Sequence, residues 1–319
     1  MSWLIWRQHR LAVLTSLLLL VAVAVPLVIS GLAMRSGYDQ LGLAACAAHS
    51  DPRCLDLLGQ FSDQYRGWGQ QLLPWLNFVP VLFGALVGAP LVARDIEQRT
   101  YLLAWTQGVT RRRWLVVKVT ALALVVVLLG AGFTALITWW RWPLDQLEGH
   151  FEPNIYDFEG LMPTAYTLFA FVLGTFVGVV LRRTVPAVGT LLAAFFVIRY
   201  LLVEVLLRPR FEAPVSTTLS ASAARPTILT GTGNWEIDGG FQDAAGRRLT
   251  ADEVNRLARQ AIDAGLSPGA WFQQHGYLRW LTYQPADRFW TFQVVEAAIF
   301  LGLSALLVAV TFRLIRRAA

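Results

Sequence analysis

A short polar segment between two apolar stretches carries the charges that could do chemistry in this chain. It reads Arg94-Asp95-Ile96-Glu97-Gln98-Arg99-Thr100, and the basic run Arg111-Arg112-Arg113 follows it. Ionised side chains in such a cluster form charge-assisted hydrogen bonds and ion pairs with another protein. The segment therefore suggests a contact for a cytoplasmic partner. The simpler alternative is an ordinary basic loop that marks the cytoplasmic side of a membrane.

Apolar residues alternate with polar ones inside this segment, which favours a helix lying along the membrane surface. Gly108 would end that helix, and Thr110 could cap the next one. Three arginines in the first turn of a helix oppose its dipole, at a cost of about 0.3–1 kcal/mol each. Lipid phosphates, Glu97 or acidic groups on a partner would offset that cost.

Catalytic and metal-binding motifs are absent from the sequence. It contains neither H-E-x-x-H nor G-x-S-x-G, and its histidines are scattered: His9, His49, His150 and His275. The phosphate loop G-x-x-x-x-G-K-[ST] is also missing. We therefore expect no catalytic residue, no metal site and no cofactor bound by this chain, which should not hydrolyse ATP by itself.

The composition is that of a membrane protein. Hydrophobic residues make up 55% and charged residues 15%, against about 45–50% and about 25% in soluble domains. The mean hydropathy of +0.49 agrees. A helix of about 20 apolar residues crosses a bilayer, and six stretches are long enough: 11–32, 75–93, 114–139, 163–181, 186–206 and 291–312.

The distribution of basic residues predicts the orientation. Short cytoplasmic loops collect Lys and Arg, and basic residues precede the first span, follow the second, join the fourth to the fifth and end the chain. The third loop is acidic instead. We expect a multi-pass protein of the plasma membrane with both termini in the cytoplasm. The net charge of +6 would serve contact with anionic lipid, and we expect no nucleic-acid partner.

The first ten residues mix aromatic, apolar and basic side chains. Trp3 and Trp6 share a helical face, and Arg7 and Arg10 follow. Such residues favour the membrane interface, which predicts an N-terminal interfacial helix. A frayed terminus with a basic anchor is the alternative.

Charged residues also occur inside the predicted spans, and two of them could pair. Arg199 lies in the fifth and Glu296 in the sixth, at similar depth. Charged groups in a bilayer face protein or water and find partners, so we expect these two to form an intramembrane pair. The pair could be a plain clamp between helices or a contact near the export path.

Cys46 and Cys54 are the two cysteines of the sequence, and both fall in the first external loop. An oxidising compartment favours a disulfide between them, with two unpaired thiols as the alternative. In the spans, Gly84 with Gly88 and Gly174 with Gly178 read G-x-x-x-G, which lets helices approach closely. We expect that contact within one chain.

The longest polar stretch separates the fifth and sixth spans and predicts a small extracellular insertion. Asp238-Gly239-Gly240 indicates a hairpin turn, and Thr250 with Glu253 matches a capping box that begins a helix. We predict a membrane domain over 1–206, with an external loop over 33–74 and a cytoplasmic coupling loop over 94–113. The insertion takes 207–290, and the sixth span with its cytoplasmic tail takes 291–319.

The loop after the second span resembles that of type-2 ATP-binding-cassette (ABC) exporter permeases. The family has an acidic residue before a Gly-Thr pair, then an Arg and a Lys near the third span. The matching positions are Glu97, Thr100, Arg113 and Lys118, and Arg99 stands where the family has Gly. The wider pattern is similar to a variant common in actinobacterial genomes. The six-span, all-α layout agrees.

The resemblance implies a division of labour. This chain would be the permease of an exporter, and a separate ABC ATPase subunit, carrying ATP and Mg, would grip the coupling loop. Glu97, Thr100, Arg111, Arg112 and Arg113 would couple the two. The permease would work as a homodimer or with a sister permease.

Two other functions remain open at this point. An ion-coupled secondary transporter would want carboxylates near the middle of the membrane and broken helices. A non-transporting membrane sensor would use the 207–290 segment as an extracellular receptor domain. ATP-dependent transport by the chain together with an ATPase would separate the permease from both.

Overall fold

The computed structural model describes residues 2–46, 52–98, 111–153, 155–208, 211–221 and 233–317. It is 77% helical, and within those ranges six helices are long and apolar enough to cross a membrane. The prediction of an all-α membrane protein with six spans is confirmed. The predicted coupling helix lies outside the described residues.

The chain divides into two compact units. The first, here called the helical unit, comprises Met1–Pro143, Tyr156–Pro209 and Thr291–Ala319. The second unit comprises Leu144–Ile155 and Arg210–Trp290. The domain boundaries inferred from the sequence stay predictions.

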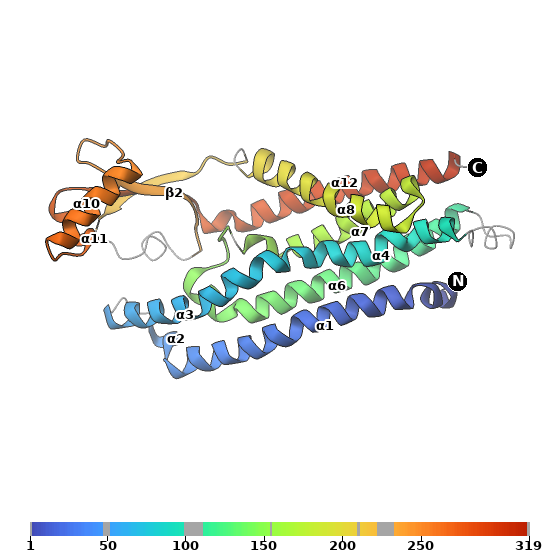
Figure 1. Cartoon of the computed structure of the whole chain (residues 1–319), viewed down its shortest axis with the longest axis horizontal. Helices are drawn as coiled ribbons and strands as arrows, with labels where there is room; N and C mark the ends of the chain where they lie inside the picture. The colour runs from blue at the N-terminus through green and yellow to red at the C-terminus, as the bar shows by residue number, and fades with distance from the viewer. Residues whose placement is uncertain are drawn as a thin grey trace. The chain divides into compact units, whose positions relative to one another are not determined.

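The spanning helices lie side by side in the helical unit (Figure 1). In chain order they are α1 (Ser2–Gln40), α4 (Phe78–Glu97), α6 (Arg111–Glu148), α7 (Met162–Leu181), α8 (Thr184–Arg199) with its continuation η2 (Tyr200–Leu207), and α12 (Phe289–Arg317). Two further helices, α2 (Leu43–Cys46) and α3 (Pro52–Leu76), connect α1 to α4, and η1 (Tyr156–Phe158) precedes α7.

Four chain segments meet at one end of this bundle. Helices α1 and α6 begin there, and α4 and α12 end there (Figure 1). We call it the loop end, and the opposite end of the bundle the far end. An even number of spans requires the start of α1 and the end of α12 to lie on the same side, as these helix ends do.

The N-terminal residues do not form a separate helix. Helix α1 runs from Ser2 to Gln40 without a break, with Pro26 inside it. Residues 2–10, which we expected to form an interfacial helix of their own, are its first turns.

Helices α4 and α7 cross with their backbones in contact. A methyl group added at Gly88 would lie 2.3 Å from the carbonyl oxygen of Phe171, and one at Gly178 would lie 2.7 Å from that of Ala89. Both distances are far below van der Waals contact, so only glycine fits. The predicted use of the G-x-x-x-G repeats within one chain is confirmed for this pair of helices.

The outer helices present apolar side chains away from the bundle. Leu18 in α1 is 68% exposed, Leu128 in α6 63% and Val185 in α8 83%. An unbroken apolar surface of this kind suits contact with lipid tails.

The second unit contains an antiparallel sheet of three strands in the order β1-β3-β2. The strands are β1 (Val215–Ser220), β2 (Trp235–Gln242) and β3 (Leu278–Gln284), followed by the short helix η3 (Ala286–Arg288). Helices α10 (Ala251–Asp263) and α11 (Pro268–Gln274) lie between β2 and β3 in sequence.

The hairpin turn expected at Asp238-Gly239-Gly240 is wrong, because these residues lie inside β2. The pairing of β2 with β3 shifts its register between Glu236 and Asp238. A methyl group added at Gly240 would lie 3.1 Å from Nε1 of Trp280. The glycine therefore makes room for an indole ring of the neighbouring strand rather than for a turn.

The predicted capping box at the start of α10 is confirmed. The amide of Glu253 donates to Oγ1 of Thr250 at 3.3 Å, and the amide of Thr250 donates to Oε2 of Glu253 at 2.8 Å. Gly265 follows the helix with φ +72°, a left-handed conformation that glycine adopts without cost.

Candidate functional site

The structure places part of the predicted coupling set. Thr100 lies outside the described residues, and so do the side chains of Arg111 and Arg112, although both residues belong to the first turn of α6. Arg113 is exposed in that turn. Glu97 is the last residue of α4. The described members of the set therefore lie where α4 leaves the bundle and α6 enters it.

Glu97 joins the end of α4 to the start of α8. Its Oε2 accepts hydrogen bonds from the amide of Thr184 at 3.2 Å and from Oγ1 of Thr184 at 3.0 Å. A carboxylate at this position also interacts favourably with the positive end of the α8 dipole. A displacement of Glu97 would thus reach the α7–α8 hairpin as well as α4.

A buried ion pair lies about half a turn before Glu97 in α4. Nζ of Lys118 in α6 donates to Oδ2 of Asp95 in α4, and the two residues are 2% and 8% exposed. The ammonium also lies 4.7 Å from the ring centroid of Trp114, a cation–π distance. The resemblance named Lys118, but it did not name Asp95 as its partner.

At the far end, five residues form what we call the charge cluster: Asp157, Tyr166, Arg199, Arg208 and Glu296. The carboxylate of Asp157 pairs with Arg199 through one oxygen and with Arg208 through the other. The hydroxyl of Tyr166 donates to Glu296 and lies 3.2 Å from Asp157. Arg208 lies 3.7 Å from Glu296 and closes the cluster.

The predicted pair of Arg199 and Glu296 is replaced by this cluster. Arg199 binds Asp157 and donates to Oδ1 of Asn77 at 3.0 Å, whereas Glu296 binds Tyr166 and faces Arg208. Sequence reasoning missed Asp157 because it lies in the acidic third loop, outside every predicted span. It missed Arg208 because that residue directly follows a span.

The two members of the cluster that lie outside the spanning segments show how it balances charge. Burial alone would raise the pKa of Asp157, but Arg208 and Arg199 outweigh it and hold that pKa below its usual value. Burial likewise opposes the charge on Arg208, yet Asp157 and Glu296 raise its pKa. Both groups stay ionised because they are paired.

The segment before α7 is held against α12 by an amide side chain. Gln293 is fully buried. Its Nε2 donates to the carbonyl oxygen of Tyr156 at 3.1 Å, and its Oε1 accepts from the amide of Leu161 at 2.9 Å. Gly160 has φ +59° and a side chain there would collide with Gln293, 2.8 Å away. The loop is thereby fixed in the position that Asp157 needs.

Cys54 is disulfide-bonded. The side chain of Cys46 lies outside the described residues, so its pairing with Cys54 stays a prediction.

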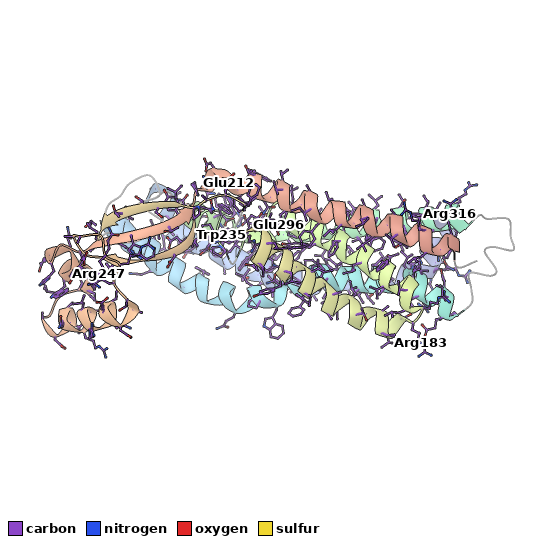
Figure 2. All side chains as sticks on the ribbon, turned by 90° about the horizontal axis from the view of Figure 1, so that it is seen from above. Arg183, Glu212, Trp235, Arg247, Glu296 and Arg316 are labelled. Carbon is purple, nitrogen blue, oxygen red and sulfur yellow. The ribbon has the colours of Figure 1, made fainter. Side chains whose placement is uncertain are left out.

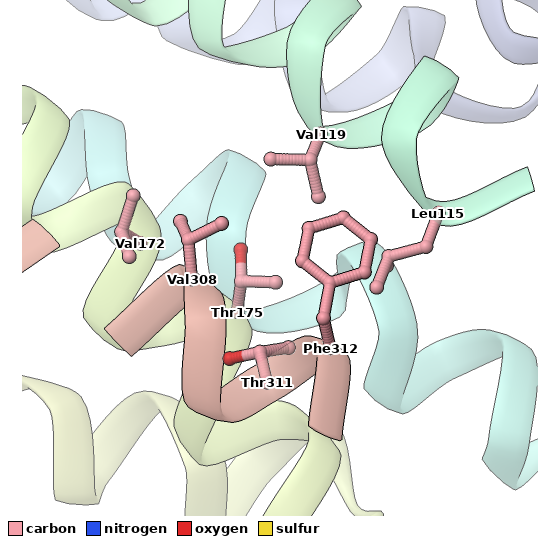
Figure 3. A pocket seen from close by; sticks show the side chains of 7 residues that line it. All are labelled: Leu115, Val119, Val172, Thr175, Val308, Thr311 and Phe312. Atoms are coloured by element: carbon pink, nitrogen blue, oxygen red, sulfur yellow. The ribbon is translucent and has the colours of Figure 1, made fainter. Parts of the chain in front are cut away.

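A small hollow lies between α6, α7 and α12 near the loop end (Figure 3). It is lined by Leu115, Val119, Val172, Thr175, Val308, Thr311 and Phe312. The hydroxyls of Thr175 and Thr311 are satisfied by carbonyl oxygens of their own helices. The hollow has a volume of about 10 Å³. This is the smallest volume that can hold one water molecule. The helices are therefore closed on each other here.

The sequence profile described as "ABC-2 membrane transporter related" matches residues 17–208, which is more than half of the chain. The chain belongs to this family. The permease thus carries, within the matched region, most of its first span, the next four spans, the 94–113 segment and all but one member of the charge cluster. Searches of curated proteins and of solved structures find no match.

Family membership gives a context for the Asp95–Lys118 ion pair and the charge cluster. An ABC-2 permease is a transport subunit and a multi-pass membrane protein, and an ABC ATPase is its partner in general. The ion pair at the loop end and the cluster at the far end join helices to one another. Their chemistry is therefore that of ion pairs and hydrogen bonds between helices, not of catalysis on a substrate.

Proposed function

We propose that this permease is the membrane-spanning subunit of an ATP-driven exporter whose ATPase is a separate protein. The family match over residues 17–208 carries the proposal. The missing phosphate loop supports the separate ATPase. ATP and Mg would bind on that partner, and this chain would bind no cofactor.

The coupling mechanism follows from the contacts at the loop end. The ATPase would grip the 94–113 segment through Glu97, Thr100, Arg111, Arg112 and Arg113. Closure of the ATPase pair would displace the segment. The Asp95–Lys118 ion pair would pass that displacement to α4 and α6 together, and the bonds from Thr184 to Glu97 would pass it to α8.

The location of the basic residues supports a plasma-membrane orientation with both termini in the cytoplasm. Arg183 and Arg316 lie toward the loop end of the helical unit, and Glu296 lies well away from it (Figure 2). By the positive-inside rule, the end that carries Arg183 and Arg316 would face the cytoplasm. The exposed apolar helix faces would contact lipid or a second permease, as a homodimer or with a sister chain. Nucleic acid is not a partner in this proposal.

Co-purification from native membrane tests the proposal. A tagged permease should bring down a nucleotide-binding subunit, and the pair should hydrolyse ATP in lipid vesicles. The variant Glu97→Arg should release the ATPase, because it reverses the charge and loses the acceptor for Thr184. Glu97→Gln keeps an acceptor and should retain more of the partner.

Asp263→Arg is the matched control, since it reverses an exposed charge in the second unit. It should leave both the co-purified ATPase and the hydrolysis rate unchanged. A folded permease that brings down no nucleotide-binding subunit, or equal retention in Glu97→Arg and Asp263→Arg, would contradict the proposal.

A further inference from the structure

The end of the fifth span is a π-helix. Helix η2 continues α8 for eight residues, and the amide of Arg208 donates to the carbonyl oxygen of Val203 at 3.0 Å. That bond reaches back five residues, which is the π pattern. π-helices are rare, occur mostly as single turns, and are frequent at functional sites. One of this length therefore depends on contacts that an α-helix could not make.

The charge cluster supplies such a contact. Arg199 directly precedes η2 and Arg208 directly follows it. In an α-helix nine residues make about two and a half turns, so the two side chains would lie on opposite faces. A π-helix has roughly four and a half residues per turn, so nine residues make about two turns. Both guanidinium groups then face the same carboxylate, that of Asp157.

The geometry points to a register switch in η2. Its π form is held by the bond between Arg208 and Asp157, and return to an α-helix releases that bond. The change would turn Arg208 away from Asp157 and Glu296, whereas Arg199, which ends α8, would keep its partner. This inference rests on the proposed transport function: the switch would let η2 open and close a gate for the cargo at the far end.

The packing around η2 leaves room for this rotation. A hollow of about 130 Å³ lies between η2 and α12, lined by Leu202, Val203, Leu206, Leu207, Ile299 and Phe300. All six side chains are apolar, so rotation about the helix axis replaces one apolar contact with another. Glu296 lies one turn before Phe300 on the same helix. Release of Arg208 and reshaping of the hollow would therefore occur together.

The switch predicts different effects for the two arginines, and the permease alone can test this. Spin labels are attached to cysteines introduced by Val205→Cys in η2 and Leu306→Cys in α12. The native side chains at these positions are 40% and 60% exposed. Cys46 and Cys54 are replaced by serine. Arg208→Gln should turn position 205 by about a third of a turn. The distance between the labels, measured by double electron–electron resonance, should change by several ångströms, up to about 10 Å. Arg199→Gln should leave it unchanged.

Two controls separate rotation of η2 from general disorder. A label at Val197, in α8 before the switch and 55% exposed, should keep its distance to position 306 in both variants. Arg208→Lys retains the charge and should keep the distance from position 205. Equal shifts in Arg208→Gln and Arg199→Gln, or no shift in either, would overturn the switch.

The second measurement uses the wild-type arginines in complex with the co-purified ATPase. Binding of a non-hydrolysable ATP analogue should reproduce the Arg208→Gln distance at position 205. If the complex hydrolyses ATP but that distance never changes, the gate is wrong and the exporter proposal stands. If Arg208→Gln shifts the distance but no ATPase is found, the register switch stands and the exporter proposal fails.

Discussion

Asp95 and Lys118 form a buried ion pair across the base of the coupling loop. They lie 23 residues apart, and the entire predicted coupling set, from Glu97 to Arg113, lies between them in the sequence. The loop therefore leaves and re-enters the bundle through helices that are already bound to each other. A force on either side of the loop acts on α4 and α6 as one body.

Removal of one member of this pair should destabilise the permease strongly. Lys118→Met removes the ammonium group that pairs with the buried carboxylate of Asp95, and the loss of one member of a buried ion pair costs about 3–5 kcal/mol. The double variant Asp95→Leu with Lys118→Met removes both charges and should be more stable than Lys118→Met alone. Thermal unfolding in detergent measures both, and additive losses would show that the two residues do not depend on each other.

The contact from Glu97 to Thr184 is exposed, so its loss should act locally. Thr184→Val keeps the shape of the side chain and removes the hydroxyl donor. We expect global stability to change by less than about 1 kcal/mol. Amide hydrogen exchange at the start of α8 should become faster, because one of the two hydrogen bonds to Glu97 at the end of α4 is lost. Unchanged exchange there would show that the hydroxyl bond from Thr184 to Glu97 does not hold the start of α8.

The crossing of α4 and α7 should tolerate no side chain at Gly88. Gly88→Ala would drive a methyl group into the carbonyl of Phe171 and should cost about 1–3 kcal/mol. Gly302→Ala in α12 is the matched control, since nothing lies within 4 Å of the added methyl group. It should be neutral, or stabilising by up to about 1 kcal/mol. Similar melting temperatures for the two variants would contradict the close crossing.

The charge cluster should weaken in acid. Asp157 has a pKa below its ordinary value of 3.8 in the folded protein. A depressed carboxylate pKa contributes stability that is present above the unfolded value and is lost as the pH falls through the folded value. The melting temperature of the wild type should therefore fall below about pH 4 more steeply than that of Asp157→Asn. Parallel curves would assign the acid effect to other groups.

Chemical labelling of intact cells tests the orientation. In a background without the native cysteines, a membrane-impermeant maleimide should modify Ala244→Cys in the second unit. It should reach Gln98→Cys at the loop end only after the membrane is permeabilised. Modification of position 98 in intact cells, with none at 244, would invert the topology and leave a cytoplasmic ATPase without a contact.

The sequence predicts the spanning helices because about 20 apolar residues in a row have few other stable environments. The capping box at Thr250 could also be predicted, because its two members lie only three residues apart in the sequence. The glycine repeats are predicted for a related reason, because only small residues allow backbones to touch.

The partners of the buried charges could not be predicted in this way. Their similar depth in the membrane predicted that Arg199 pairs with Glu296. Depth does not show how each helix is rotated about its axis, and that rotation decides which side chains meet. A change from an α-helix to a π-helix moves Arg208 to the opposite face of the helix. The types of the neighbouring residues do not predict that change. The prediction of a turn at Asp238-Gly239-Gly240 is wrong for a similar reason. In the sequence, a glycine that makes room for Trp280 cannot be told from a glycine that makes a turn.

Asn77 stands between α3 and α4 and accepts a hydrogen bond from Arg199. Helix α4 therefore has the charge cluster at one tip and the Asp95–Lys118 pair at the other, about 30 Å away along its twenty residues. Each end of α4 is thus in contact with a charged side chain of another helix, Arg199 at one end and Lys118 at the other. A tilt of α4 would therefore act on both contacts, because each lies at one end of the same helix.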